Sequence, residues 1–116
     1  MEYKISSSQT FDTWFDSLKE DAKIDVFTII RLLKELGPKL PFPYSSKIQG
    51  SKISHLRELR IQHKGKPYRV LYAFDPTRQA FLILGGDKTG KNRWYKKSIK
   101  QAEKIYLEHL KEIGDL

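Results

Sequence analysis

The chain has 116 residues, which fits one domain spanning residues 1–116, and 39% of them are hydrophobic, enough for a modest core. It contains no cysteine, which excludes disulfides, thiolate zinc sites and thiol nucleophiles and favours a reducing compartment. The opening residues lack the apolar stretch of a signal peptide, and no run approaches the roughly 18 residues of a membrane span. We therefore expect a cytoplasmic protein with no membrane partner.

The positive charge is concentrated in the middle of the chain. Residues 47–100 carry 14 basic and 3 acidic side chains, a net of +11, whereas the net charge of residues 1–46 is −1 and that of residues 101–116 is −2. Crowded like charges attract polyanions. A solvated, solubilising face is the alternative, but the asymmetry favours a nucleic acid as partner.

The first part of the chain predicts a short strand followed by two amphipathic helices. Residues 3–5 are expected to form the strand, and apolar residues then recur at helical spacing over 11–18. Asp21 is expected to cap a second helix, whose apolar stripe runs over 22–36 and ends at Gly37. Core packing accounts for both stripes, so these helices are expected to be scaffold.

The second part predicts three strands and a closing helix. After a loop over 38–54, strand-like runs occupy 56–63, 68–74 and 81–84, and a helix follows over 92–113. This order predicts an α+β fold, in which two N-terminal helices and a C-terminal helix pack on a small, mainly antiparallel sheet. The sheet face away from the helices could remain open for a ligand.

Two arginines are expected to face each other across the first hairpin of this sheet. With residues 64–65 as the loop, Arg60 pairs with Arg69 and Glu58 pairs with Leu71. Like charges in opposite positions destabilise a sheet by roughly 0.2–1 kcal/mol unless an acid or a bound anion compensates them. Glu58 is close enough to do the former and a phosphate could do the latter, so both interpretations remain open.

The glycine-rich segment after the last strand resembles a P-loop in its spacing. Asn92 replaces the Ser or Thr that would bind magnesium, and the preceding strands are expected to be antiparallel, so a P-loop is rejected. The glycines of this segment, Gly85, Gly86 and Gly90, are expected instead to form a turn that brings Lys88 and Lys91 to the sheet edge.

Basic and aromatic side chains alternate over residues 88–100. Basic groups neutralise phosphates and aromatic rings stack on unpaired bases, a combination typical of single-strand binding. One of Trp94 and Tyr95 is expected to pack in the core and the other to be free. The side chains expected to bind RNA are Arg57, Lys91, Arg93, Trp94, Lys96 and Lys97.

The three histidines show no ligand-like spacing, so neither a metal site nor a cofactor is expected. A mechanism based on a pair of histidines is not visible either. If the protein cuts RNA, proton transfer would fall to Glu58, Tyr72, Tyr95 or a lysine with a lowered pKa.

Four motifs together resemble the HigB-like (phage Gp49-like) branch of the RelE/ParE toxin superfamily. They are Leu-Arg-Glu-Leu-Arg at 56–60, Pro-Tyr-Arg-Val-Leu-Tyr at 67–72, Gly-Gly-Asp-Lys-Thr-Gly at 85–90 and Arg-Trp-Tyr at 93–95. The resemblance implies a RelE-like, microbial-ribonuclease-like fold. It also implies a type II toxin that is neutralised by a helix-turn-helix (HigA-like) antitoxin and that cuts mRNA on the ribosome.

The resemblance also implies roles for individual residues in a metal-free attack of the 2′-hydroxyl on the adjacent phosphodiester. Arg60 and Arg69 would stabilise the phosphorane, Lys88 would bind phosphate or activate the nucleophile, and Tyr95 would stack on a base or assist proton transfer. Glu58 completes the expected catalytic set. Two alternatives remain: a ParE-like inhibitor of DNA gyrase without catalytic activity, and a non-catalytic nucleic-acid-binding module.

Overall fold

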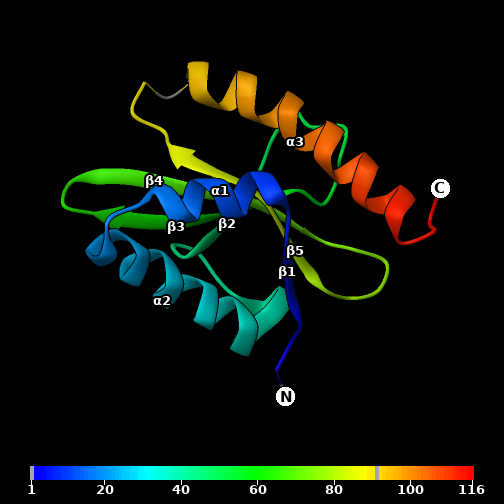
Figure 1. Cartoon of the computed structure of the whole chain (residues 1–116), viewed down its shortest axis with the longest axis horizontal. Coiled ribbons are helices and arrows are strands. Elements are labelled where there is room, and N and C mark those ends of the chain that lie inside the picture. Colours follow the sequence, from blue (N-terminus) through cyan, green and yellow to red (C-terminus); the bar gives the residue numbers. More distant parts are fainter. Residues whose placement is uncertain (1, 91) are drawn as a thin grey trace.

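The computed structural model describes residues 2–90 and 92–116, and it places a sheet between helices (Figure 1). The elements in chain order are β1 (Ile5–Ser7), α1 (Gln9–Ser17), α2 (Glu20–Leu36), the 3-10 helix η1 (Gly37–Lys39), β2 (Ser45–Lys47), β3 (Arg57–His63), β4 (Lys66–Phe74), β5 (Ala80–Asp87) and α3 (Asn92–Glu112). Figure 1 shows the strands running between α2 and α3. None of these helices in the described part of the chain is both long and apolar enough to cross a membrane.

The sheet has five strands in the order β1-β5-β4-β3-β2, and β1 is parallel to β5 while the other pairs are antiparallel. This confirms the expected α+β fold with a mainly antiparallel sheet. Between β4 and β5 the register shifts by one residue, because Leu71 pairs with Leu84 whereas Tyr72 pairs with Leu82. Such a bulge changes which face the following residues of the strand point to.

Local sequence signals explain where the first two helices begin and end. Ser8 caps α1, since its hydroxyl accepts a hydrogen bond from the Phe11 backbone N–H at 2.9 Å. The expectation that Asp21 caps α2 is wrong, because the cap position is Lys19. Asp21 lies in the first turn, where its negative charge stabilises the positive end of the helix dipole. Gly37 ends α2 with a φ of 57°, a conformation that glycine adopts without strain.

Apolar side chains fill both faces of the sheet. Alternate residues of β4 point to opposite faces, so Val70 and Tyr72 join the core under α1 and α2, while Leu71 and Ala73 join the core under α3. The expectation of an open sheet face is therefore wrong over the area that α3 covers. Tyr106 of α3 is only 5% exposed there, because the apolar stripe of the closing helix needs a surface to pack on.

Gly85 and Gly86 belong to β5 and not to a turn, so the expectation of a glycine turn is wrong for these two residues. A Cβ atom at Gly85 would lie 2.4 Å from the ring of Trp14, and one at Gly86 would lie 2.5 Å from Nε1 of Trp94. Each glycine thus lets an indole ring approach the strand backbone closely, one on each face of the sheet. The turn comes later in the chain, where Gly90 has a φ of 102°.

Candidate functional site

Arg60 and Arg69 occupy opposite positions on β3 and β4, as the hairpin register predicts, and Glu58 is paired with Leu71. The carboxylate of Glu58 lies between the two guanidinium groups. Its Oε2 is 3.5 Å from Nη1 of Arg60, and its Oε1 is 3.5 Å from Nε of Arg69. An acid inside the protein therefore compensates the facing positive charges, which was one of the two open interpretations.

The Glu58 carboxylate also accepts two hydrogen bonds from neighbouring elements. Ser46 on β2 donates to Oε2 at 2.8 Å, and the hydroxyl of Tyr95 on α3 donates to Oε1 at 2.6 Å. The side chain of Glu58 is only 7% exposed. A buried carboxylate is stable in such a place because it is both paired and hydrogen-bonded. Ser46 was not among the site residues expected from the sequence, because its position depends on the pairing of β2 with β3.

The two arginines differ in how far they can reach solvent. The side chain of Arg69 is 5% exposed, and its Nη1 donates to the backbone oxygen of Tyr68 at 2.9 Å. Its buried Nε has no hydrogen-bond partner among the described residues and faces Glu58 at ion-pair distance. Arg60 is 29% exposed and can meet a ligand directly. We call Glu58, Arg60, Arg69 and Tyr95 the Glu58 cluster.

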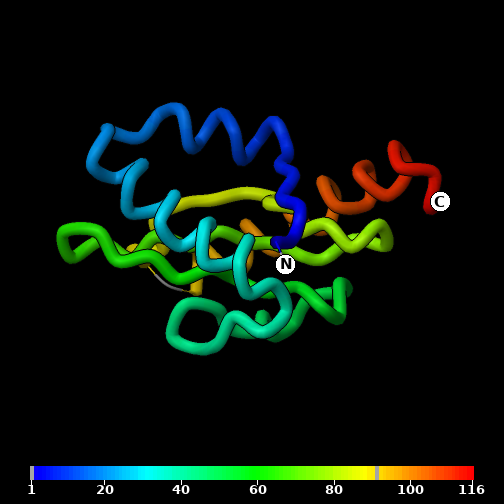
Figure 2. The backbone as a smooth tube through the Cα atoms, turned by 90° about the horizontal axis from the view of Figure 1, so that it is seen from below, coloured from blue at the N-terminus to red at the C-terminus, as the bar shows by residue number. Residues whose placement is uncertain are grey.

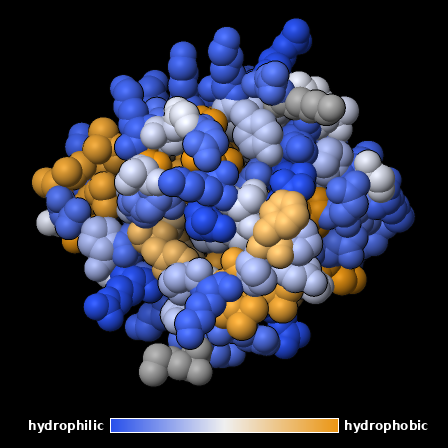
Figure 3. Space-filling view, turned by 180° about the vertical axis from the view of Figure 1, so that it is seen from behind, coloured by the Kyte–Doolittle hydropathy of each residue, from blue (hydrophilic) through white to orange (hydrophobic). Residues whose placement is uncertain are grey.

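A cavity of about 350 Å³ opens beside this cluster. Its lining is made up of Ile29, Pro43, Tyr44, Arg60, Ile61, Gln62 and Arg69. Figure 2 shows the segment between α2 and β3 on the opposite side of the sheet from α1, and Figure 3 views the molecule from that opposite side. The surface in Figure 3 is mostly hydrophilic, with apolar side chains in separate groups. Because Arg60 lines the cavity, an anionic group bound in it would meet the guanidinium of Arg60.

Tyr95 is held as a proton donor. Burial, together with the hydrogen bond to Glu58 and its negative charge, raises the pKa of Tyr95 to about 12, although Arg69 acts in the opposite direction. The hydroxyl is therefore protonated at neutral pH. Nζ of Lys88 lies over the Tyr95 ring, 5.7 Å from its centroid.

The connection from β5 to α3 holds Lys88 next to this ring. The Lys88 backbone N–H donates to the backbone oxygen of Pro67 at 2.9 Å, which extends the pairing with β4. Asp87 accepts hydrogen bonds from the backbone N–H and the hydroxyl of Thr89. Burial on its own would raise the pKa of Asp87, but these bonds and the charge of Lys66 lower it overall. The carboxylate is thus ionised and fixes the turn.

The remaining residues expected to bind RNA lie in different places. Arg93, Lys96 and Lys97 are exposed on the first turns of α3, next to Tyr95 in the chain, whereas Lys91 lies outside the described residues. The expectation that one aromatic residue is free is wrong, because Trp94 and Tyr95 are both half-buried against the core under α3.

The structure does not bring Arg57 or Tyr72 to the Glu58 cluster. Both point to the face under α1 and α2: Arg57 donates from Nε to the hydroxyl of Ser45 at 3.0 Å, and the Tyr72 hydroxyl lies 2.6 Å from the same oxygen. Tyr72 is 1% exposed, so it cannot transfer a proton to a ligand on the other face.

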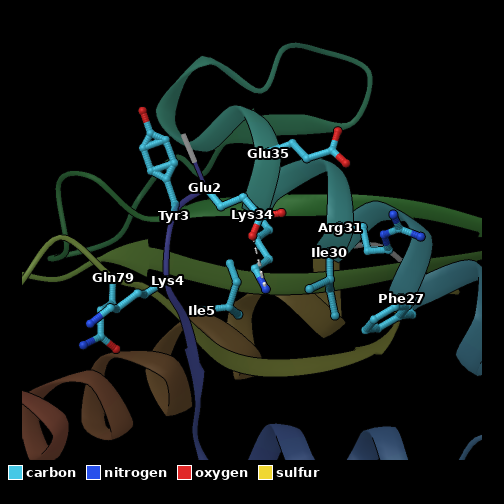
Figure 4. Close-up of a pocket in the computed structure, with 10 residues that line it drawn as sticks. All are labelled: Glu2, Tyr3, Lys4, Ile5, Phe27, Ile30, Arg31, Lys34, Glu35 and Gln79. Atoms are coloured by element: carbon cyan, nitrogen blue, oxygen red, sulfur yellow. Dashed lines mark ion pairs between the residues drawn. The ribbon is translucent and has the colours of Figure 1, made fainter.

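A larger cavity, of about 810 Å³, lies elsewhere, between the N-terminal segment and α2 (Figure 4). Its lining mixes acidic and basic side chains, and Lys34 forms an ion pair with Glu2 at 3.8 Å across it. It contains no member of the Glu58 cluster. Over residues 2–90 and 92–116, no three His, Cys, Asp or Glu side chains gather in a set that could hold a metal ion.

Comparison with a solved structure defines the class of fold. A double arginine-to-alanine mutant of the Escherichia coli toxin RelE in the free state superposes with a TM-score of 0.61, covering 87% of this chain and 98% of that one at 15% sequence identity. At this identity the likeness concerns the fold alone. The fold is therefore of the RelE type.

Sequence comparison then identifies the family. The model of the family described as "Phage derived protein Gp49-like (DUF891)" matches residues 13–107. The chain is 35% identical over 109 residues to HigB2 and 43% identical over 93 residues to HigB3, two candidate toxins of Mycobacterium tuberculosis. The alignments cover 92% and 79% of this chain, but 54% of HigB2 and 80% of HigB3. The chain belongs to the Gp49-like family and is similar in sequence to the HigB toxins.

Proposed function

We propose that this protein is the toxin of a toxin-antitoxin pair and acts as an endoribonuclease on mRNA at the ribosome, with a helix-turn-helix antitoxin as its partner. Family membership and the net charge of +11 over residues 47–100 support a nucleic-acid target. The observation that carries the proposal is the Glu58 cluster. It combines two guanidinium groups, a carboxylate and a protonated phenol within a few ångströms, and it borders a cavity.

The guanidinium groups would act on the phosphodiester. Arg60 would bind two phosphate oxygens through its planar fork, and the charge of Arg69 below it would add to the positive field. Lys88, held at the Tyr95 ring, would approach the same phosphate from the α3 side. Negative charge grows on the phosphorus oxygens as the pentacoordinate phosphorane forms, so fixed cations favour that state over the ground state.

The Glu58–Tyr95 hydrogen bond offers a route for the protons. In the proposed reaction the substrate 2′-oxygen forms a bond to phosphorus, the bond from phosphorus to the 5′-oxygen breaks, and a 2′,3′-cyclic phosphate results. Glu58 would take the proton of the 2′-hydroxyl, and Tyr95 would give its proton to the departing 5′-oxygen. The proton on Glu58 would then pass to Tyr95 along their 2.6 Å contact, which restores both groups.

Induced expression followed by mapping of mRNA ends tests the proposal. We expect translation to stop and new mRNA 3′ ends to appear that carry a 2′,3′-cyclic phosphate. An SOS response with filamentation and intact messages would instead identify a gyrase inhibitor. Binding of RNA by the purified protein, without cleavage on or off the ribosome, would identify a non-catalytic module.

A further inference from the structure

The segment between η1 and β2 presents two aromatic side chains to solvent beside the Glu58 cluster. Phe42 is 69% exposed and Tyr44 is 41% exposed. The sequence suggested only a loop here. An exposed phenylalanine by itself is common on protein surfaces. Its neighbours decide whether it has a function.

Phe42 is coupled to Arg60. The guanidinium carbon of Arg60 lies 5.1 Å from the centroid of the Phe42 ring, within the range of a cation–π contact. The backbone N–H of Arg60 also donates to the backbone oxygen of Tyr44 at 2.9 Å. The backbone hydrogen bond attaches the loop to β3 at the residue that we propose binds phosphate, and it places the Phe42 ring next to the guanidinium.

The cavity of about 350 Å³ places the same loop against both arginines, because Pro43 and Tyr44 line it together with Arg60 and Arg69. A ligand bound there would meet positive charge, and the exposed Phe42 ring lies just outside the lining, next to Arg60. A nucleotide has this pair of groups, a phosphate and a flat base. Only an unpaired base can offer its face to a protein ring, because neighbours cover the base faces within a duplex.

We propose that Phe42 and Arg60 form a nucleotide subsite, in which the Phe42 ring stacks on an unpaired base of single-stranded RNA while Arg60 binds the phosphate next to it. This inference rests on the proposed function, since it names the form of RNA that the Glu58 cluster takes. The subsite accepts any of the four bases, because each has a face that stacks on a ring. Arg60 therefore acts on the phosphate and also orients the ring.

The test measures binding of a fluorescein-labelled, 2′-O-methylated single-stranded RNA by anisotropy, since methylation blocks 2′-hydroxyl attack. We expect Phe42→Leu to weaken binding at least about fivefold and Phe42→Trp to retain or strengthen it, because stacking on an aromatic ring supplies the affinity. Phe27→Leu is the matched control: Phe27 is 54% exposed on α2 and lies outside the cluster. It should bind RNA as the wild type does.

A duplex of the same sequence adds a second readout. We expect Phe42→Leu to bind the duplex as the wild type does, since the stacking contact needs an unpaired base. Wild-type affinity of Phe42→Leu for the single strand would overturn the subsite, as would an equal loss of affinity for the duplex. A Phe42→Leu variant that binds RNA normally but loses its antitoxin would make the ring a protein contact, which also overturns it.

The same variants separate failure of the subsite from failure of the proposed function. If the wild type cuts mRNA while Phe42→Leu keeps full affinity for the single strand, the subsite alone is wrong. If the wild type never cuts RNA while Phe42→Leu loses affinity, the subsite stands and the nuclease proposal is wrong. Melting curves check folding, which an exposed side chain should hardly affect.

Discussion

Arg60 and Arg69 lie directly opposite each other on neighbouring strands, with a guanidinium nitrogen of each 3.5 Å from the same carboxylate. The repulsion that two facing cations would cause is therefore compensated before any anion binds. A phosphate arriving at this place meets cations whose geometry is already held by the protein. Such preorganisation is what electrostatic catalysis requires. The effect of these charges on RNA cleavage can therefore be measured separately from their effect on the stability of the fold.

Replacing Arg60 by alanine should reduce RNA cleavage by about 100-fold or more, the usual effect of removing one donor that stabilises a transition state. The change in the free energy of unfolding should stay below about 1 kcal/mol, because a partly exposed ion pair contributes little to stability. Cleavage rates and urea unfolding measure the two effects. Arg31→Ala, an exposed arginine on α2, is the control, and equal activity loss in both variants would contradict the assignment.

Glu58→Gln should destabilise the fold by about 3 kcal/mol, since it leaves the nearly buried Arg69 without its counter-charge. Adding Arg60→Ala to this variant should recover part of the loss, because one uncompensated cation is then removed. A double-mutant cycle in urea measures the coupling. Additive effects of the two changes would show that the 3.5 Å contact between Glu58 and Arg60 contributes nothing to stability.

The stability of the protein should fall between about pH 10 and pH 12 through Tyr95. Its pKa is near 10 in the unfolded chain and about 12 in the folded protein, so the stabilisation is complete below pH 10 and is lost as pH rises through the folded pKa. Tyr95→Phe has no proton to lose and should show a shallower decline over this range. Chemical unfolding at several pH values compares the two, and parallel curves would rule out a raised pKa at Tyr95.

Asp75 should contribute to stability at the acid end of the pH range. Burial acts to raise its pKa, but hydrogen bonds from Thr77, His109 and Gln79 lower it overall. The sign follows from linkage: this stabilisation is present above the unfolded pKa of about 3.9 and disappears as pH falls through the lower folded value. Asp75→Asn should therefore be less stable at pH 7, and its free energy of unfolding should fall less steeply as the pH is lowered. Urea unfolding at several acid pH values measures this, and a fall in stability as steep as that of the wild type would contradict it.

Gly86→Ala should destabilise the protein by about 1–3 kcal/mol, the usual cost of overpacking. The added Cβ would lie 2.5 Å from Nε1 of Trp94, and the indole would have to move. Combining the change with Trp94→Phe, which removes the indole nitrogen, should restore part of the stability. Thermal melts of the single and double variants measure this. No recovery in the double variant would place the strain in the strand backbone instead.

The hairpin register of the arginine pair was predictable from the sequence, because the length of a two-residue turn fixes which residues face each other. The helices and the three strands of the meander follow from apolar periodicity. Both are local properties. The position of Arg57 is predictable in the same way: it is next to Glu58 on β3, so strand alternation makes it point to the other face of the sheet.

Features that depend on distant segments could not be read from the sequence. Ser46 reaches Glu58 because β2 pairs with β3. Gly85 and Gly86 look like turn residues, and their close contact with Trp14 and Trp94 becomes visible only when helices from both ends of the chain are in place. The position of Phe42 beside Arg60 likewise depends on how the loop closes on β3.

The two consecutive glycines of β5 have a practical consequence for watching this protein fold. The chain has two tryptophans, and each indole rests on the backbone of β5 from a different side of the sheet. Single-tryptophan variants would thus carry one intrinsic fluorophore for the docking of α1 and another for the docking of α3. Stopped-flow fluorescence on the pair would show whether the helix layer that carries Tyr95 assembles before, with or after the opposite layer.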